Sequence, residues 1–212
     1  MIKVAFTGAP DSGKTTLAKM VSARLNLQGY VPSYVHEFAR DYITKYGIRP
    51  NTVAEQFYVL HVQERREREM CSNSTQIMYT DCPIVLSYIY AIDLVEDAKD
   101  LEMLAELYEE TLLLLGNNNS CTGLRDSLRL SNPRYDLIFM LRPFRETVKD
   151  DVRAQDWDRI GKLDRQIKAF LDLHGIEHIE LTSTDMEQRI ADVEKAIKEK
   201  LNGRSGNIQG NS

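Results

Sequence analysis

The 212-residue sequence has few cysteines and no long apolar segment. Its three cysteines, Cys71, Cys82 and Cys121, lack the spacing of metal ligands, and their odd, small number is typical of a reducing compartment rather than of a disulfide framework. No apolar run approaches the ~18 residues that a membrane-spanning helix needs, and the N-terminus carries no charged and then apolar leader. We therefore expect a cytoplasmic protein with no membrane partner.

Positive charge is also not in excess. The formal net charge is −5, so the chain as a whole has no electrostatic attraction for nucleic acid, although a local basic patch is compatible with this value. The sequence shows no internal repeat and no domain linker, and its length allows one large α/β domain, which we expect to cover residues 1–202. Residues 203–212 are rich in Gly, Asn and Ser and are predicted to form a disordered tail.

A glycine-containing segment near the N-terminus carries the most specific pattern. Residues 8–15 read Gly-Ala-Pro-Asp-Ser-Gly-Lys-Thr and match G-x-x-x-x-G-K-[ST]. Residues 2–7 before them are largely apolar, as in a buried strand, and residues 16–25 after them place apolar side chains at helical spacing. Strand, loop and helix are the context that a phosphate-binding loop requires, so we predict nucleotide binding here.

The residue types of this loop suit a nucleoside triphosphate and a metal ion. Gly8 and Gly13 let the backbone bend around a phosphate without a Cβ in the way, and the backbone N–H groups and the helix N-terminus then face the negative charge. Lys14 is expected to reach the β- and γ-phosphates, and the Thr15 hydroxyl to bind Mg²⁺. The predicted nucleotide-binding residues are Gly8, Ala9, Pro10, Asp11, Ser12, Gly13, Lys14, Thr15 and Thr16.

Two further predicted strands end in carboxylates. Residues 31–36 are followed by charged residues that include Glu37 and Arg40, and doubly wound sheets bind ligands at the carboxyl ends of their strands. The alternative is a solvated helix start, where Glu37 would interact favourably with the helix dipole. Residues 76–81 predict a buried strand that ends in Asp81, which matches an acid that holds Mg²⁺ directly or through water.

Strands and helices alternate along the rest of the chain. Strands are expected at 135–141 and 176–181, and helices at 51–71, 84–95, 98–115, 158–174 and 185–201. This order predicts a three-layer α/β sandwich with a five-stranded parallel sheet and right-handed crossovers, the fold of P-loop NTPases such as nucleoside kinases. Within the helices we expect His61 at the edge of the core, Leu101 facing inward and residues 64–69 on a solvated face with i,i+4 ion pairs.

A charged segment follows the fourth predicted strand. Residues 142–159 contain four arginines, one lysine, a proline and little apolar periodicity. Their position in the second half of a phosphate-loop domain favours a lid that closes over the triphosphate and brings cations to the transferred group. The alternative is a charged surface loop, because five acidic residues are interleaved with the basic ones.

Several of these segments together resemble a known group of phosphate-loop kinases. The resemblance rests on residues 8–16, His36-Glu37-Phe38-Ala39-Arg40-Asp41-Tyr42-Ile43, residues 56–65, Tyr79-Thr80-Asp81, and Asp151-Val152-Arg153 before the helix that ends in Phe170-Leu171. Over roughly residues 1–200 the chain is similar to kinases related to the nicotinamide riboside kinase domain of bacterial NAD regulators. Many members of this group are phage proteins, and they are similar to, or include, kinases of 5-hydroxymethyluracil in phage DNA.

The resemblance implies an ATP-dependent kinase that uses Mg²⁺ and transfers the γ-phosphate to a hydroxyl of a nucleoside-type acceptor. The residues it implies are Lys14 for the phosphates, Thr15 and Asp81 for the metal ion, Glu37 to orient or deprotonate the acceptor hydroxyl, Arg153 for the migrating phosphoryl group and Arg40 for the acceptor. Two further arginines of the predicted lid, Arg145 and Arg159, are additional candidates for substrate binding.

Two acceptors and one other class of protein remain open. The favoured acceptor is 5-hydroxymethyluracil in phage DNA, which would place the protein in the host cytoplasm; the alternative is a free nucleoside such as nicotinamide riboside. The phage-like resemblance favours DNA, and the lack of an adenylyltransferase domain in the sequence weakens the interpretation as an enzyme of NAD synthesis. A DNA acceptor needs phosphate contacts, for which Arg65, Arg66, Arg68 and residues 142–159 are candidates, and a base in a duplex must be flipped out. The other class is a regulatory ATPase or GTPase switch, although no Asn/Thr-Lys-x-Asp segment that would read guanine is present.

Overall fold

Five parallel strands form the centre of the molecule. A computed structural model describes residues 1–71, 75–116, 134–143 and 157–206. The strands are β1 (Ile2–Thr7), β2 (Pro32–Val35), β3 (Ile77–Thr80), β4 (Leu137–Leu141) and β5 (Ile179–Leu181). Their order in the sheet is β2-β3-β1-β4-β5, and every neighbouring pair is parallel. The predicted five-stranded parallel sheet is confirmed.

The central strands are apolar along their length because both faces of the sheet are covered. In β1, Val4 and Phe6 belong to the core on one face, whereas Ala5 belongs to the core on the other. In β4, Phe139 packs with the first core and Met140 with the second. This alternation is the two-residue period of a strand, and it divides the interior into two separate cores.

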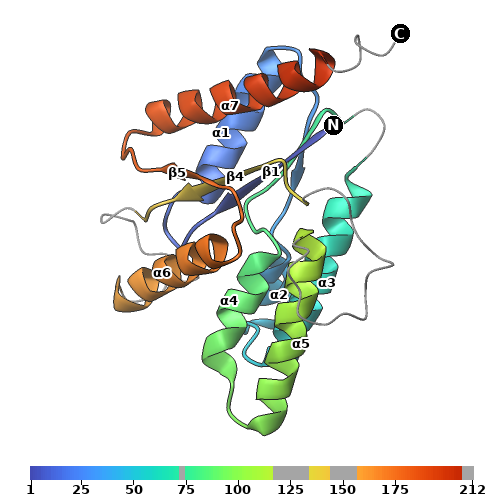
Figure 1. Cartoon of the computed structure of the whole chain (residues 1–212), viewed down its shortest axis with the longest axis vertical. Helices are drawn as coiled ribbons and strands as arrows, with labels where there is room; N and C mark the ends of the chain where they lie inside the picture. Colours follow the sequence, from blue (N-terminus) through green and yellow to red (C-terminus); the bar gives the residue numbers. More distant parts are fainter. Residues whose placement is uncertain (72–74, 117–133, 144–156, 207–212) are drawn as a thin grey trace.

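Helices cover the two faces unequally. Helices α1 (Lys14–Leu27) and α7 (Met186–Gly206) cover the first face, as Figure 1 shows. Helices α3 (Val53–Glu69), α4 (Val85–Ala91), α5 (Ala98–Leu115) and α6 (Trp157–Leu173) cover the second, and the shorter α2 (Phe38–Tyr46) and η1 (Ile92–Leu94) lie in the connections. The connection from β1 to β2 crosses the first face of the sheet. The connections from β2 to β3, from β3 to β4 and from β4 to β5 run in the opposite direction across the second face, so all four crossovers have the same hand. The predicted three-layer sandwich is therefore confirmed.

Capping residues in the sequence account for where the long helices begin. At the start of α3, the Glu55 backbone N–H donates to Thr52 Oγ1 (3.2 Å) and the Thr52 N–H donates to Glu55 Oε2 (3.1 Å), which is a complete capping box. At the start of α5, Asp97 Oδ1 accepts from the Asp100 N–H at 2.8 Å. These local signals explain why the predicted helices at 51–71 and 98–115 agree closely with α3 and α5.

Three element boundaries differ from the prediction. The apolar stretch expected as one helix at 84–95 is divided into α4 and η1. The strand expected from residue 176 begins at Ile179, because the Ile176 N–H still donates to Leu171 O (2.9 Å) in the turn that ends α6. Helix α7 continues to Gly206, four residues into the segment expected as a tail.

Burial along two helices also differs from the prediction. His61 is exposed rather than at the edge of the core, and Leu101 is 59% exposed rather than inward. On α3 the expected i,i+4 ion pairs are present, for example Arg65 with Glu69 at 2.7 Å, but Glu67 on the same helix is only 2% exposed. Periodicity places residues on helix faces, but it does not identify which polar residue has a buried partner elsewhere in the chain.

The partners of Glu67 come from the segment before β4. Arg134 Nε donates to Glu67 Oε2 at 2.9 Å, and the Tyr135 hydroxyl donates to Glu67 Oε1 at 2.9 Å. The same hydroxyl accepts from the Ile84 N–H (3.2 Å) just before α4. Burial raises the pKa of the Glu67 carboxyl, and the positive charge of Arg134 opposes this rise. The cluster links α3, the start of α4 and the entrance to β4.

Part of the predicted lid and tail lies outside the described residues, as do Cys121, Arg145 and Arg153. In the part of the chain that the structure describes, no helix is both long and apolar enough to cross a membrane. Cys71 and Cys82 are free thiols.

Candidate nucleotide and acceptor site

The phosphate loop lies at the carboxyl edge of the sheet, where the direction of the connections reverses. The chain leaves β1 towards β2 on one side and leaves the adjacent β4 towards β5 on the other. Ligands of doubly wound sheets bind at this switch point. The loop bends through positive φ at Gly8 (138°), Asp11 (62°) and Gly13 (84°), and α1 begins directly after it at Lys14.

Gly8 is required by packing rather than by space for a ligand. A Cβ at this position would lie 2.3 Å from the carbonyl oxygen of Leu141, the last residue of β4. The loop therefore packs closely against the end of β4, and a larger residue at position 8 would displace the backbone. From the sequence we expected the missing Cβ of Gly8 to leave space for a phosphate; in the structure that space is occupied by the carbonyl group of Leu141.

The Lys14 side chain folds over the loop that precedes it. Its ammonium donates to the carbonyl oxygens of Gly8 (2.9 Å) and Ala9 (2.8 Å). Burial lowers the pKa of Lys14, while the negative charges of Glu37 and Asp81 act in the opposite direction. The amine thus lies between the loop carbonyls and two carboxylates, at the position where the motif expects the phosphates.

Thr15 and Asp81 present a pair of oxygens that suits Mg²⁺. The Thr15 hydroxyl donates to Asp81 Oδ2, and Asp81 is only 2% exposed. The other oxygen, Asp81 Oδ1, is buried with no hydrogen-bond partner among the described residues. No cluster of three or more His, Cys, Asp or Glu side chains suited to a metal occurs in those residues either. A site with one carboxylate and one hydroxyl suits Mg²⁺, which binds few protein ligands and completes its shell with phosphate and water oxygens.

Glu37 links β2 to α2 and faces the same cavity. Arg40, three residues later, places its Nε 3.6 Å from Glu37 Oε2, and the Glu37 side chain is 29% exposed. Burial is the main cause that raises the pKa of Glu37; the charge of Asp81 raises it further, and Lys14 and Arg40 lower it. A carboxyl with a raised pKa is a stronger base than a solvent-exposed one.

A buried glutamine fixes the turns that carry the two carboxylates. Gln63 of α3 is 1% exposed. Its Oε1 accepts from the Phe38 N–H (2.9 Å), next to Glu37, and its Nε2 donates to Thr80 Oγ1 (3.3 Å), next to Asp81. One side chain therefore sets the relative positions of the ends of β2 and β3.

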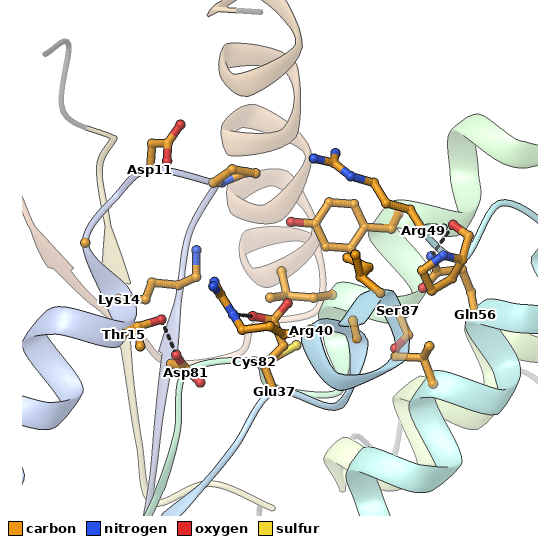
Figure 2. A pocket seen from close by; sticks show the side chains of 18 of the residues that line it. Asp11, Lys14, Thr15, Glu37, Arg40, Arg49, Gln56, Asp81, Cys82 and Ser87 are labelled. Atoms are coloured by element: carbon orange, nitrogen blue, oxygen red, sulfur yellow. Dashed lines mark hydrogen bonds and ion pairs between the residues drawn. The ribbon is translucent and has the colours of Figure 1, made fainter. Parts of the chain in front are cut away.

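These groups line a single cavity of about 370 Å³. Figure 2 shows Asp11, Lys14 and Thr15 at one end, Arg49, Gln56 and Ser87 at the other, and Glu37, Arg40, Asp81 and Cys82 between them. The lining also includes apolar side chains from the helices that carry Gln56 and Ser87 and from α2 and η1, namely Ile43, Val59, Leu86 and Leu94, together with Pro50 and Tyr90. The cavity therefore has a charged compartment at the phosphate loop and, beyond Glu37, a second compartment, here called the apolar compartment, in which Arg49, Gln56 and Ser87 accompany apolar side chains of the same helices.

The structure brings most of the predicted site residues together. Of the predicted nucleotide-binding residues, those at positions 10, 11 and 13–16 line the cavity, whereas Gly8, Ala9 and Ser12 are buried beneath it. Arg40 and Arg159 also line it.

Arg142 differs from its predicted position in the lid. Its guanidinium pairs with Asp164 of α6 (2.5 Å) and with Glu180 of β5 (2.7 Å). Its charge is therefore used to join β4, α6 and β5 and does not lie over the phosphate loop. Arg159 belongs to the first turns of α6 rather than to a loop.

Among the cavity residues that were not predicted from the sequence are four with polar groups: Arg49, Gln56, Ser87 and Tyr90. Ser87 and Tyr90 lie in an apolar helix and resemble ordinary core residues. Burial and the nearby charge of Glu37 raise the pKa of the Tyr90 hydroxyl, and the charges of Arg49 and Arg159 lower it. No local sequence pattern marks these positions, because only the fold places α2, α3 and α4 around one space.

Solved structures with this fold include NadR protein and a deoxyadenosine kinase. A structure of NadR protein in complex with NR is 20% identical, has a TM-score of 0.69, and the match covers 92% of this chain and 51% of that one. NadR in complex with NAD and AMP-PNP is 19% identical with a TM-score of 0.64, covering 92% and 49%. Deoxyadenosine kinase from M. mycoides with products dcmp and dcdp is 15% identical with a TM-score of 0.56, covering 95% and 100%.

The chain thus spans about half the length of the NadR chains that it matches. At these identities the likeness shows the fold alone, a parallel α/β sandwich shared with these proteins. No curated protein sequence matches the chain. The sequence profile of a family described as an AAA domain matches residues 3–189, which include the phosphate loop, both carboxylates and all five strands. The chain belongs to this AAA domain family.

Proposed function

We propose that this protein is a kinase that transfers the γ-phosphate of ATP to a hydroxyl group of a nucleoside-type acceptor. The observation that carries the proposal is the position of Glu37. It lies in the same cavity as Lys14 and Asp81, at the boundary between the charged compartment and the apolar one. A protein that only binds or hydrolyses a nucleotide needs no second compartment beyond such a carboxylate.

Glu37 is proposed to orient the acceptor hydroxyl and to accept its proton during transfer. Burial and the charge of Asp81 raise its pKa, which makes it a better base for this task, and the positive charges of Lys14 and Arg40 oppose this rise. Phosphoryl transfer relies mainly on positioning and on the neutralisation of charge, so the contribution of a base is expected at the low end of its usual ~10²–10⁴-fold range.

Lys14 and the pair formed by Thr15 and Asp81 are proposed to bind the triphosphate and its metal ion. The buried Asp81 Oδ1 without a hydrogen-bond partner in the described chain supports a cation at this point. Mg²⁺ bound there would neutralise phosphate charge. Lys14 places its ammonium beside the loop carbonyls and holds the end of the triphosphate nearest to Glu37.

The apolar compartment supports a planar, weakly polar acceptor such as a nucleobase. Ile43, Val59 and Leu86 provide apolar surface, while Gln56 and Ser87 provide groups that form hydrogen bonds. Small-molecule sites combine a mostly apolar lining with a few polar groups in this way. The NadR structure with NR and the deoxyadenosine kinase structure with nucleotide products are consistent with a nucleoside-type acceptor.

Two acceptors are proposed for the test. The resemblance of the sequence to phage kinases favours 5-hydroxymethyluracil in DNA, whereas the neighbours named above are described with small-molecule ligands. The arginines considered for DNA contacts on α3 are engaged with carboxylates: Arg65 with Glu69, Arg66 with Asp41 and Arg68 with Glu64. These pairs balance the surface charge, and this observation favours a free nucleoside as the second candidate.

The test is transfer of radiolabelled γ-phosphate from ATP. The acceptors are single-stranded and duplex oligonucleotides that contain 5-hydroxymethyluracil, the same oligonucleotides with thymine, nicotinamide riboside and deoxyadenosine. Label on one acceptor, absent with Lys14→Ala, supports the kinase and identifies its substrate. Phosphate released equally with and without every acceptor would refute the kinase and favour a nucleotide-dependent switch.

A further inference from the structure

A buried arginine on the last helix contacts the phosphate loop without lining the cavity. Arg189 of α7 is only 1% exposed and is not among the residues that line the cavity. Its guanidinium donates to three backbone carbonyls: Nη1 to Ser12 O (2.9 Å), Nη2 to Arg142 O (3.2 Å) and Nε to Ser183 O (2.5 Å). These carbonyls belong to the phosphate loop, the end of β4 and the turn after β5.

The bond to Ser12 determines the orientation of the next N–H group. The peptide between Ser12 and Gly13 is trans and planar, so its carbonyl and its N–H point in opposite directions. Because the Ser12 carbonyl points to Arg189, away from the cavity, the Gly13 N–H points towards it. Gly13 itself lines the cavity. Backbone N–H groups of such a loop are the ligands of phosphate.

We propose that Arg189 is a positioning residue for phosphate binding, which aims the Gly13 N–H at the nucleotide by holding the Ser12 carbonyl. The guanidinium is suited to this role because its planar fork donates in several fixed directions at once. Its bonds to Arg142 and Ser183 fix the guanidinium against two strand ends, so that the loop is held to the rigid sheet. The inference rests on the phosphate-binding part of the proposed function and not on the identity of the acceptor.

A second observation explains why the loop needs such a restraint. Gly13 has a φ of 84°, and a glycine in this region is free to adopt many other conformations. On one side of Gly13, the Leu17 N–H donates to Gly13 O at 2.9 Å in the first turn of α1. On the other side, Arg189 donates to Ser12 O. The two peptide groups that flank Gly13 are thus each held by one hydrogen bond, one from α1 and one from α7.

The test compares phosphate binding by Arg189→Gln, Arg189→Lys and a control variant. Dissociation constants for Mg²⁺-ATP and for inorganic tripolyphosphate are measured by calorimetry, together with melting temperatures. The control is Ile190→Ala, the next residue of α7, which is fully buried in the core between α7 and the sheet. It is expected to lower the melting temperature without changing either dissociation constant.

Arg189→Gln is expected to weaken both ligands by about tenfold, since a hydrogen bond to a charged group is lost. The effect should be equal for the two ligands because the Gly13 N–H acts on phosphate and not on the base. Arg189→Lys should recover part of the affinity, because lysine keeps the charge but cannot form the three-way fork. If Arg189→Gln does not fold, Arg189→Lys serves alone, with an expected loss of about threefold for both ligands.

Three results would overturn the inference. The first is a folded Arg189 variant that binds both ligands like the wild type, which would make the residue purely structural. The second is a loss for ATP without a loss for tripolyphosphate, which would mean that Arg189 acts through the Ser183 turn. The third is a wild-type protein that binds neither ligand, and this result would also refute the proposed function. Wild-type binding without acceptor phosphorylation would refute the kinase but leave Arg189 in its role.

Discussion

Replacing Arg134 by methionine tests the buried cluster that holds the entrance to β4. The Arg134 side chain is 10% exposed and that of Glu67 is 2% exposed, so solvent screens their interaction little. Removing one partner of a buried ion pair costs about 3–5 kcal/mol, because an uncompensated charge remains. Glu67 would keep the Tyr135 hydroxyl as a donor, which places the expected loss in unfolding free energy near the lower end, about 3 kcal/mol.

The loss should depend on pH in a defined direction. Burial already raises the pKa of Glu67 in the folded protein, and removing the Arg134 charge raises it further. When the pKa of a carboxyl group is higher in the folded protein than in the unfolded chain, the folded protein binds the proton more tightly. The free energy of unfolding therefore falls as the pH rises from the unfolded-state pKa through the folded-state pKa. The Arg134→Met deficit should therefore be larger at pH 8 than at pH 5.

The assay is urea denaturation followed by far-UV circular dichroism at the two pH values. Arg65→Met is a matched control, because Arg65 pairs with Glu69 on the same helix but is 71% exposed; it should leave the unfolding free energy nearly unchanged at both pH values. The double variant with Glu67→Gln should regain part of the stability. A deficit below about 1 kcal/mol, or one that is equal at both pH values, would refute the reasoning.

Four further predictions concern turnover with the true acceptor. Lys14→Ala should reduce kcat at least about a hundredfold without unfolding the protein, as measured by steady-state kinetics and circular dichroism. Glu37→Gln should lower kcat more than it raises the KM for ATP. In Arg40→Ala, the acidic limb of the plot of kcat against pH should move to higher pH, because Arg40 lowers the pKa of Glu37 in the wild type. If this limb does not move, Glu37 is not the group that causes it. Gln63→Leu should cost about 1–3 kcal/mol and also slow turnover, because it removes the restraint between the ends of β2 and β3. Arg153→Ala should slow the chemical step in single-turnover experiments with little effect on ATP affinity, and normal chemistry would argue for a charged surface loop.

The fold was predictable because its signals are local. The phosphate loop fixes the strand before it and the helix after it, and the continuous apolar strands indicate a sheet that is covered on both faces. Thr52 and Asp97 cap their helices through neighbours three residues away, so those ends were visible in the sequence. The acids after β2 and β3 were found because parallel strands bring their carboxyl ends together.

The features that were missed depend on contacts between distant parts of the chain. Glu67 appears as one charge among many on α3 until Arg134, 67 residues later, is placed beside it. Arg189 resembles any polar residue of a terminal helix, yet it contacts a carbonyl 177 residues away. Tyr90 was taken as part of an apolar helix because periodicity does not distinguish a core position from a cavity wall.

The division of the cavity between two layers has a consequence for how the protein can change. The phosphate-binding groups lie mainly in the loop and on α1, which covers the first face of the sheet, whereas the apolar lining comes from α2, α3, α4 and η1, of which α3 and α4 cover the second face. Substitutions at Ile43 or Leu86 can reshape the compartment beyond Glu37 without altering the packing beneath Lys14. Selectivity for the acceptor is therefore modular: an exchange of only the apolar lining residues of α2, α3, α4 and η1 between relatives would be expected to transfer substrate preference, while Lys14, Thr15 and Asp81 stay the same.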